Sequence, residues 1–226
     1  MIDVRSFSVG PIQENAYIVR SSAQASTAVM IDPGEEPQRL LNAARDLGTE
    51  IEAILITHCH FDHIGAVAPI AKATGAPVYC PEMETVVLAD IMKWTMPGFG
   101  PFENWQAEQA VKGGERLRLA GLDIEVLFTP GHSPGHVTYA LDGGLLSGDV
   151  LFQGSVGRVD LPGGDWTTLE RSIGDLMGRF ERDTVVYPGH MGVTTLGREL
   201  DTNPFLSELR AAAAREPEGA QRARTS

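Results

Sequence analysis

The chain has 226 residues, of which 42% are hydrophobic, and a formal net charge of −12. This length is enough for one large core, and we expect a single domain over residues 1–226 with a frayed tail from about residue 216. The acidity argues against a nucleic-acid substrate. Without a signal-peptide pattern or a run of roughly 18 apolar residues, we expect a cytoplasmic protein with no membrane partner.

Apolar runs of strand length alternate with helical patterns along the chain. In the first half we predict strands at 3–9, 15–20, 27–32, 51–56 and 77–80, and helices near 36–47, 63–74 and 82–92. In the second half we predict strands at 116–119, 123–128, 137–141, 145–148 and 184–187, and helices near 166–180 and 204–215. Periodicity alone therefore predicts a mixed α/β fold.

The densest motif is His58-Cys59-His60-Phe61-Asp62-His63, which follows the predicted strand 51–56. In extended backbone, residues two apart face the same side, so His58 and His60 are placed to bind one metal ion together. The chain then turns and a helix begins near Asp62, which directs Asp62 and His63 toward a second ion. Cys59 points to the opposite face, where we expect it to pack.

Three later motifs place a glycine and then a metal-binding residue just after a predicted strand: Gly131-His132, Gly148-Asp149 and Gly189-His190. Imidazole and carboxylate bind zinc, iron and manganese, and ligands must converge from separate segments to surround an ion. Paired hydrolytic ions lie roughly 3.5–4 Å apart, so a bridging carboxylate is expected, and Asp149 is the candidate. We expect His136 to hold its loop or to hydrogen-bond a ligand.

In this order, the motifs resemble those of the metallo-β-lactamase-fold hydrolases. The run 58–63 is similar to their H-x-H-x-D-H signature, and segments 129–136, 147–152 and 203–206 look most like glyoxalase II and its short relatives. The resemblance implies a four-layer αββα sandwich and two divalent ions, with zinc expected and iron or manganese as alternatives. It also implies the ligands: His58, His60 and His132 for the first ion, Asp62, His63 and His190 for the second, and Asp149 for both.

Such a site favours one class of reaction. Two ions lower the pKa of a shared water toward neutrality and polarise a substrate carbonyl, and Asp62 is a candidate to orient the resulting hydroxide. Once five histidines are ligands, only His136 remains as a general acid, and no lysine lies within the motifs. A thiolate leaves with little proton help, whereas an amine does not. We therefore predict that a small 2-hydroxyacyl thioester is hydrolysed.

Three points stay open at this stage. A persulfide dioxygenase of the same fold uses one iron held by two histidines and a carboxylate, for which His58, His132 and Asp149 are available, although the additional ligands favour two metals. The aromatic, glycine-rich segment 93–105 either lines the mouth of the pocket or packs its own aromatic rings. Arg158 either holds a substrate carboxylate or forms a structural salt bridge.

Overall fold

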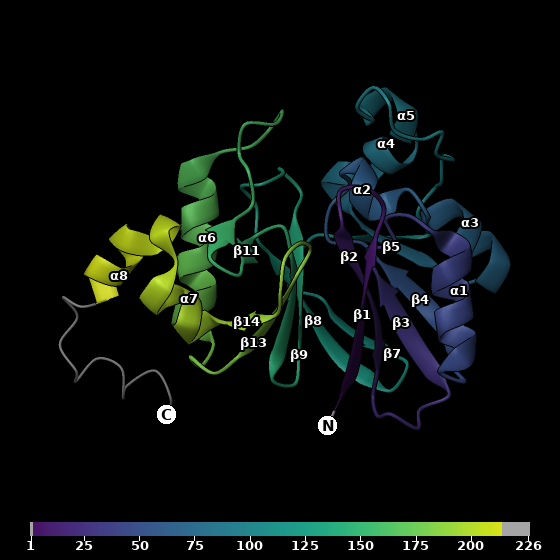
Figure 1. The fold of residues 1–226 in the computed structure, drawn as a ribbon, viewed down its shortest axis with the longest axis horizontal. Helices are drawn as coiled ribbons and strands as arrows, with labels where there is room; N and C mark the ends of the chain where they lie inside the picture. Colours follow the sequence, from purple (N-terminus) through teal and green to yellow (C-terminus); the bar gives the residue numbers. More distant parts are fainter. Residues whose placement is uncertain (1, 214–226) are drawn as a thin grey trace.

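The computed structural model describes residues 2–213, which form two six-stranded sheets stacked face to face (Figure 1). The first sheet has the order β1-β2-β3-β4-β5-β6. Its strands are β1 Asp3–Val9, β2 Glu14–Arg20, β3 Thr27–Ile31, β4 Glu50–Leu55, β5 Val78–Pro81 and β6 Gln109–Val111. β1 to β3 pair antiparallel, and β3 to β6 pair parallel.

The second sheet has the order β14-β13-β10-β9-β8-β7. Its strands are β7 Arg116–Leu119, β8 Leu122–Phe128, β9 Val137–Leu141, β10 Gly144–Gly148, β13 Val185–Pro188 and β14 Thr194–Thr195. Only the β10–β13 pair in this sheet is parallel. A separate two-stranded ribbon joins β11 Leu151–Phe152 to β12 Ser155–Val156.

Helices cover the outer faces of both sheets (Figure 1). Helices α1 Pro37–Asp46 and α3 Val67–Thr74 lie against the first sheet, whereas α6 Trp166–Arg179, α7 Leu196–Thr202 and α8 Ser207–Ala213 lie on the side of the second. Shorter pieces are α2 Phe61–Ile64, α4 Thr85–Leu88, α5 Ile91–Trp94 and the 3-10 turns η1 Glu82–Glu84 and η2 Pro204–Leu206. The predicted αββα sandwich is confirmed.

Three layers of apolar side chains hold these four layers together. Along β2, Tyr17 and Val19 face the second sheet, while Ala16 and Ile18 face the helices α1 and α3. This alternation follows from the two-residue period of a strand, and because both faces are covered every residue of β2 is buried. A third cluster packs α6 on the outer face of the second sheet. Burial on both faces makes the strand ends rigid supports for loops.

Two segments predicted as single helices are each divided into shorter pieces. The helix predicted over 82–92 is divided into η1, α4 and α5, and α4 is separated from α5 because Asp90 leaves the helical region with φ −148° and ψ 56°. This break turns both Leu88 and Ile91 into the core while Val86 stays exposed. The helix predicted over 63–74 is divided into α2 and α3 by Gly65 and Ala66.

Several short elements were missed: β6, the β11–β12 ribbon, β14 and α7. Strands of two or three residues are too short to show a period, so their pairing is decided by tertiary neighbours. The helix predicted over 204–215 is described to residue 213, as η2 followed by α8, and the predicted frayed tail lies outside the described residues. Within residues 2–213, no helix has the length and apolar character needed to cross a membrane.

Candidate metal centre

Four loops meet at one end of the two sheets and carry all seven predicted ligands. They follow the carboxyl ends of β4, β8, β10 and β13. Because β10 and β13 are parallel and Gly148 pairs with Pro188, the residues after them, Asp149 and His190, leave the same edge of the sheet. Loops held at the ends of buried strands can direct several side chains to one point. The structure therefore brings together what the sequence separates.

Three imidazole nitrogens form a tight triangle. The distances are 3.1 Å from His58 Nε2 to His60 Nδ1, 3.1 Å from His58 Nε2 to His132 Nε2, and 2.8 Å from His60 Nδ1 to His132 Nε2. Tetrahedral zinc with Zn–N bonds of about 2.0–2.1 Å has nitrogen neighbours about 3.3 Å apart. The triangle is close to that size, so these three side chains fit one ion.

A second cluster lies beside the first. Asp62 Oδ2 is 3.4 Å from His190 Nε2 and 3.9 Å from His63 Nε2. The buried His63 Nε2 has no hydrogen-bond partner among the described residues. A buried polar atom normally has a partner, so this nitrogen is free to bind an ion. The ligand atoms of the three residues all lie within 4.8 Å of one another.

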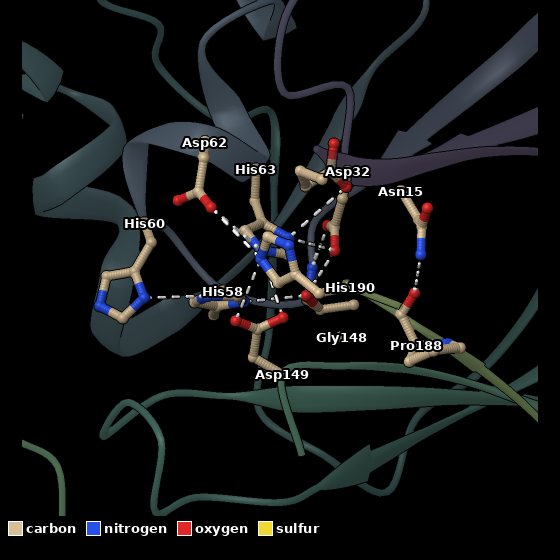
Figure 2. A network of polar contacts seen from close by, with 12 residues as sticks. Asn15, Asp32, His58, His60, Asp62, His63, Gly148, Asp149, Pro188 and His190 are labelled. Atoms are coloured by element: carbon tan, nitrogen blue, oxygen red, sulfur yellow. Dashed lines mark hydrogen bonds and ion pairs between the residues drawn. The ribbon is translucent and has the colours of Figure 1, made fainter. Parts of the chain in front are cut away.

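Asp149 lies between the two clusters, and Figure 2 shows its carboxylate facing the histidine rings. Oδ1 is 3.3 Å from His63 Nε2, and Oδ2 is 3.4 Å from His132 Nε2 and 3.6 Å from His190 Nε2. Burial acts to raise the pKa of Asp149, but the facing imidazoles, His63 foremost, hold it below its usual range. Asp149 is therefore an anion that lies within reach of the nitrogen atoms of both clusters.

The protonation of the histidines differs between the clusters. Burial lowers the pKa of His58, and burial together with His132 lowers that of His60 to about 4. Both rings are therefore neutral and able to act as ligands. For His63, burial also opposes the charged form, but the carboxylates of Asp149 and Asp62 prevail and raise its pKa. An ion bound in the second cluster would therefore take the place of a proton on His63.

A hydrogen-bond chain through Asp32 orients one histidine of each cluster. His58 Nδ1 lies 3.1 Å from Thr57 Oγ1, which donates to Asp32 Oδ2 at 2.6 Å. His63 Nδ1 donates to the same Asp32 oxygen at 3.1 Å. Hydrogen bonds of this kind leave the other ring nitrogen, Nε2, free for a metal. Asp32 was missed from the sequence, although it directly follows the apolar strand β3, as the ligand motifs follow theirs.

Backbone contacts orient the ligands of the second sheet. His132 Nδ1 donates to the Arg158 carbonyl oxygen at 2.7 Å, which again leaves Nε2 free. His136 Nε2 accepts from the Asp149 backbone N–H at 3.1 Å, while its Nδ1 lies 3.1 Å from Thr129 Oγ1. Both nitrogens of His136 are thus engaged within the protein. This arrangement matches the supporting role expected for His136.

Glu84 ties two ligand loops together. Its Oε2 accepts from the Cys59 backbone N–H at 2.5 Å, and its Oε1 accepts from Ser133 Oγ and, at 3.0 Å, from the Gly135 backbone N–H. Cys59 lies between two ligands, and its side chain packs against Cys80 with the sulfur atoms 3.4 Å apart. Glu84 was also missed, because a glutamate in a polar helical pattern carries no distinguishing signal.

Asn15 fastens the loop that carries His190. Its Nδ2 donates to the carbonyl oxygens of Pro188 at 3.1 Å and Met191 at 2.9 Å, and Figure 2 shows the first of these bonds. Asn15 belongs to β2 of the first sheet, so this contact joins the two halves of the molecule. Space at the loop is tight: a Cβ at Gly189 would collide with the Asp149 carboxylate. Position 189, which lies against Asp149 and precedes His190, therefore accommodates only glycine.

The structure places Arg158 and segment 93–105, the two features considered for contact with the substrate. The Arg158 guanidinium is exposed and pairs with the exposed Asp160, with Nε–Oδ1 2.6 Å and Nη2–Oδ2 2.7 Å; Arg158 also lines the cavity over the metal centre, so its contact with a substrate carboxylate stays a prediction. Segment 93–105 contributes side chains to the cavity and to the core, rather than packing its aromatic rings on one another. Trp94 and Met96 line a cavity over the metal centre, while Phe99 and Phe102, together with Trp105, pack against the core below.

Comparisons with known proteins agree with this geometry. The family described as the metallo-beta-lactamase superfamily matches residues 9–190. Hydroxyacylglutathione hydrolase GloC of Haemophilus influenzae is 31% identical over 215 residues, covering 91% of this chain and 99% of that protein. BLEG-1 B3 metallo-β-lactamase is 37% identical with a TM-score of 0.85, covering 91% of this chain and all of that one. TTHA1623 in a di-iron-bound form is 41% identical with a TM-score of 0.74, covering 89% of this chain and all of that one.

Proposed function

This chain belongs to the metallo-β-lactamase superfamily, and from that membership we propose that it is a metal-dependent hydrolase of small 2-hydroxyacyl thioesters that works in the manner of glyoxalase II. The similarity to a hydroxyacylglutathione hydrolase over nearly the whole chain supports the reaction class. We also propose that residues 1–226 form one domain, since ligands from both halves build one site.

Two divalent ions would occupy the centre. His58, His60 and His132 would hold the first, Asp62, His63 and His190 would hold the second, and Asp149 would serve both. Mixed nitrogen and oxygen donors suit zinc, and also iron or manganese; the di-iron form of TTHA1623 keeps iron in consideration. When bound, the ions supply an activated water and polarise the substrate carbonyl.

Asp62 is placed to handle the attacking water. Burial acts to raise its pKa, but His63 and His190 keep it lowered, so the group is a carboxylate at neutral pH. It is partly exposed and lines the cavity above the centre. A carboxylate in this position can accept a hydrogen bond from water and direct its lone pair toward the substrate.

The observation that carries the proposal is the set of side chains around the cavity. Of the described residues that line it, the histidines are His60, His132 and His190, all assigned to metals, and no lysine or tyrosine is among them. His136 is engaged at both ring nitrogens. Burial raises the pKa of Glu84, which also lines the cavity, but both its oxygens accept hydrogen bonds from the two ligand loops. Among the described lining residues, therefore, no unengaged side chain is placed to protonate an amine leaving group, whereas a thiolate leaves without a proton. Thioesters are therefore favoured over amides.

A parallel assay of one purified preparation tests the proposal. Metal content is measured together with hydrolysis of S-lactoyl thioesters, hydrolysis of a chromogenic β-lactam, and oxygen uptake with glutathione persulfide. We expect two metals per chain and thioester hydrolysis. The β-lactam is included because BLEG-1 is 37% identical; a kcat/KM for it equal to or above that of the thioester overturns the proposal. One iron with oxygen uptake indicates the persulfide dioxygenase instead.

A further inference from the structure

A large cavity opens directly over the metal centre. Its volume is about 930 Å³, which is at the upper end of typical small-molecule sites. Its floor is formed by five of the assigned ligands: His60, Asp62, His132, Asp149 and His190. Any group attached to the reacting carbonyl or to the leaving sulfur must extend from this floor along the walls. The walls therefore select the substrate.

The walls are apolar and come from both halves of the chain. On one side stand Met83, Val86, Val87, Trp94 and Met96, carried by the broken helical segment η1 to α5. Facing them, Phe152, Val156, Leu161 and Pro162 come from the β11–β12 ribbon and the chain that leads into α6. Ile12 and Met191 complete the enclosure. Figure 1 shows α4 and α5 standing above the end of the first sheet.

These walls expose apolar side chains to an unusual degree. Val86 is 64% exposed, Met83 59% and Met191 57%, and Trp94 and Met96 are each more than 40% exposed. Exposed apolar surface is costly, at about 25 cal/mol per Å², and a contiguous patch of it commonly marks a binding site. Methionine side chains also adapt to ligands of different shape. The patch is continuous with the metal centre, which indicates a substrate group as its occupant.

Away from the metal ligands, the walls offer few partners for the charged groups of a thiol such as glutathione. Among the described residues that line the cavity, Arg158 is the one permanent cation, and its exposed guanidinium pairs with the exposed Asp160. Asp62, Glu84 and Asp149 are the carboxylates of the lining, and the charge of two bound divalent ions would offset theirs at the floor. The two carboxylates of a glutathione thioester would find little to bind here, since carboxylate recognition requires free guanidinium, ammonium or backbone donors.

We propose that the substrate carries an uncharged apolar group, aliphatic or aromatic, which packs against Met83, Val86, Trp94, Met96 and Met191. This inference rests on the proposed thioester hydrolysis and specifies its substrate class. The reaction itself is unchanged: water adds its oxygen to the acyl carbon, the carbon–sulfur bond breaks, and a carboxylic acid and a thiol are released. The apolar group belongs either to the acyl part or to the thiol part.

Four thioesters separate these possibilities. S-lactoylglutathione is the charged reference and S-lactoyl-N-acetylcysteamine the small neutral one. S-(2-hydroxyhexanoyl)-N-acetylcysteamine places the apolar group on the acyl side, and S-lactoyl benzyl mercaptan places it on the thiol side. Each kcat/KM is divided by the rate of alkaline hydrolysis to remove intrinsic reactivity. Burial of one methylene is expected to contribute about fourfold, so one apolar substrate should exceed both references at least tenfold. Equal or better use of S-lactoylglutathione overturns the inference.

A matched pair of variants locates the effect. Val86→Ser changes a cavity side chain that is 64% exposed, and Val193→Ser makes the same change at a position that is 47% exposed and outside the cavity lining. Neither disturbs the core, so both should fold. We expect Val86→Ser to lower the corrected kcat/KM of the preferred apolar substrate, relative to that of S-lactoyl-N-acetylcysteamine, about threefold. Val193→Ser should leave this ratio unchanged. An equal effect of the two variants contradicts the assignment.

A binding measurement separates failure of this inference from failure of the proposed function. The thioethers S-hexyl- and S-methyl-N-acetylcysteamine cannot be hydrolysed, and their binding is followed by tryptophan fluorescence, since Trp94 lines the cavity. One outcome is that no thioester is cleaved, yet the S-hexyl compound binds at least tenfold more tightly than the S-methyl compound and Val86→Ser weakens its binding. The apolar site is then correct and thioester hydrolysis is wrong. If thioesters are cleaved but the two compounds bind equally, the apolar site is wrong.

Discussion

At the scale of single residues, the centre depends on where each lone pair points. His58, His63 and His132 each have Nδ1 engaged by a neighbouring oxygen and Nε2 directed at the site. Asp32 accepts directly from His63 and reaches His58 through Thr57, so it acts on both clusters. Supporting residues of this kind commonly change metal affinity by about 10–100-fold when altered.

Asp149 is the residue shared by both clusters, so Asp149→Ala is expected to lose both metals together. His132→Ala removes a ligand of the first cluster only and should retain about one ion per chain, because the second cluster keeps Asp62, His63 and His190. Elemental analysis of the purified variants measures this directly. Asp142→Ala, an exposed aspartate in the turn between β9 and β10, is the control. Full occupancy in Asp149→Ala would exclude a bridging role.

At the scale of elements, rigid strands end in loops that must be held relative to one another. Glu84, at the end of η1, performs this task through three hydrogen bonds to the loops of residues 57–60 and 129–136. Asn15 does the same for the His190 loop from β2. The broken helical segment thus serves two purposes: it brings Glu84 inward and holds apolar side chains over the cavity.

Glu84→Gln is expected to weaken binding of the first ion about 10–100-fold and to affect the second ion less. The amide replaces one acceptor oxygen by an N–H donor. This donor must face either the Cys59 N–H or the donors of the 129–136 loop, so the hydrogen bonding to one of the two ligand loops is lost. Competition titration with a chelator resolves the two affinities. Glu82→Gln, in the same turn but exposed and paired with Lys112, is the control. Identical titrations for the two variants would show that Glu84 does not position the site.

The edge of the first sheet holds a pH-dependent ion pair between Asp3 of β1 and the buried Arg20 of β2, at 2.5 Å. Burial acts to raise the pKa of Asp3, but Arg20 and Arg5 hold it below the usual range of an aspartate. A carboxyl with a lowered folded pKa stabilises the fold above its unfolded pKa and loses this effect as the pH falls through the folded value.

Asp3→Ala should therefore lower the free energy of unfolding at pH 7 by about 1–3 kcal/mol, because it leaves the Arg20 guanidinium without its carboxylate. The difference from the unchanged protein should shrink as the pH falls below about 4. Denaturant unfolding at several pH values measures it. Asp123→Ala, which breaks the exposed Arg118–Asp123 pair, should change stability little. A pH-independent effect of Asp3→Ala would show that lost packing, not charge, is responsible.

At the scale of the whole molecule, the proposed ions join two halves. Residues 58–63 follow a strand of the first sheet, whereas His132, Asp149 and His190 follow strands of the second. Each cluster contains ligands from both halves. A ligand that binds only the folded state shifts the unfolding equilibrium by mass action, so the ions should stabilise the packing of one sheet on the other.

Metal loading is expected to raise the free energy of unfolding by about 2.7 kcal/mol per ion at a free metal concentration 100 times the Kd. Unfolding should remain a single transition, as one domain requires. Denaturant curves of the loaded protein and of protein treated with chelator provide the comparison, and His190→Ala should reduce the gain. Two separate transitions, or equal stability with and without metal, would contradict this view of the molecule.

The sequence by itself determined much of this protein. Apolar runs of strand length predicted the strands that precede the ligands, because burial on one or both faces imposes a regular pattern. Dense histidine and aspartate motifs just after those runs predicted which residues would meet. Short strands such as β14, and the break at Asp90, escaped prediction, since two or three residues carry no period.

Only the tertiary structure decided how the site is supported and what surrounds it. Asp32, Glu84 and Asn15 contact a ligand or a ligand loop through residues 25 or more positions away in the chain, and such contacts leave no local pattern. The cavity likewise gathers side chains from six separate segments. Ligand identity follows from the chemistry of a residue and its place on a strand, whereas orientation and substrate selection depend on distances that exist only once the two sheets are packed together.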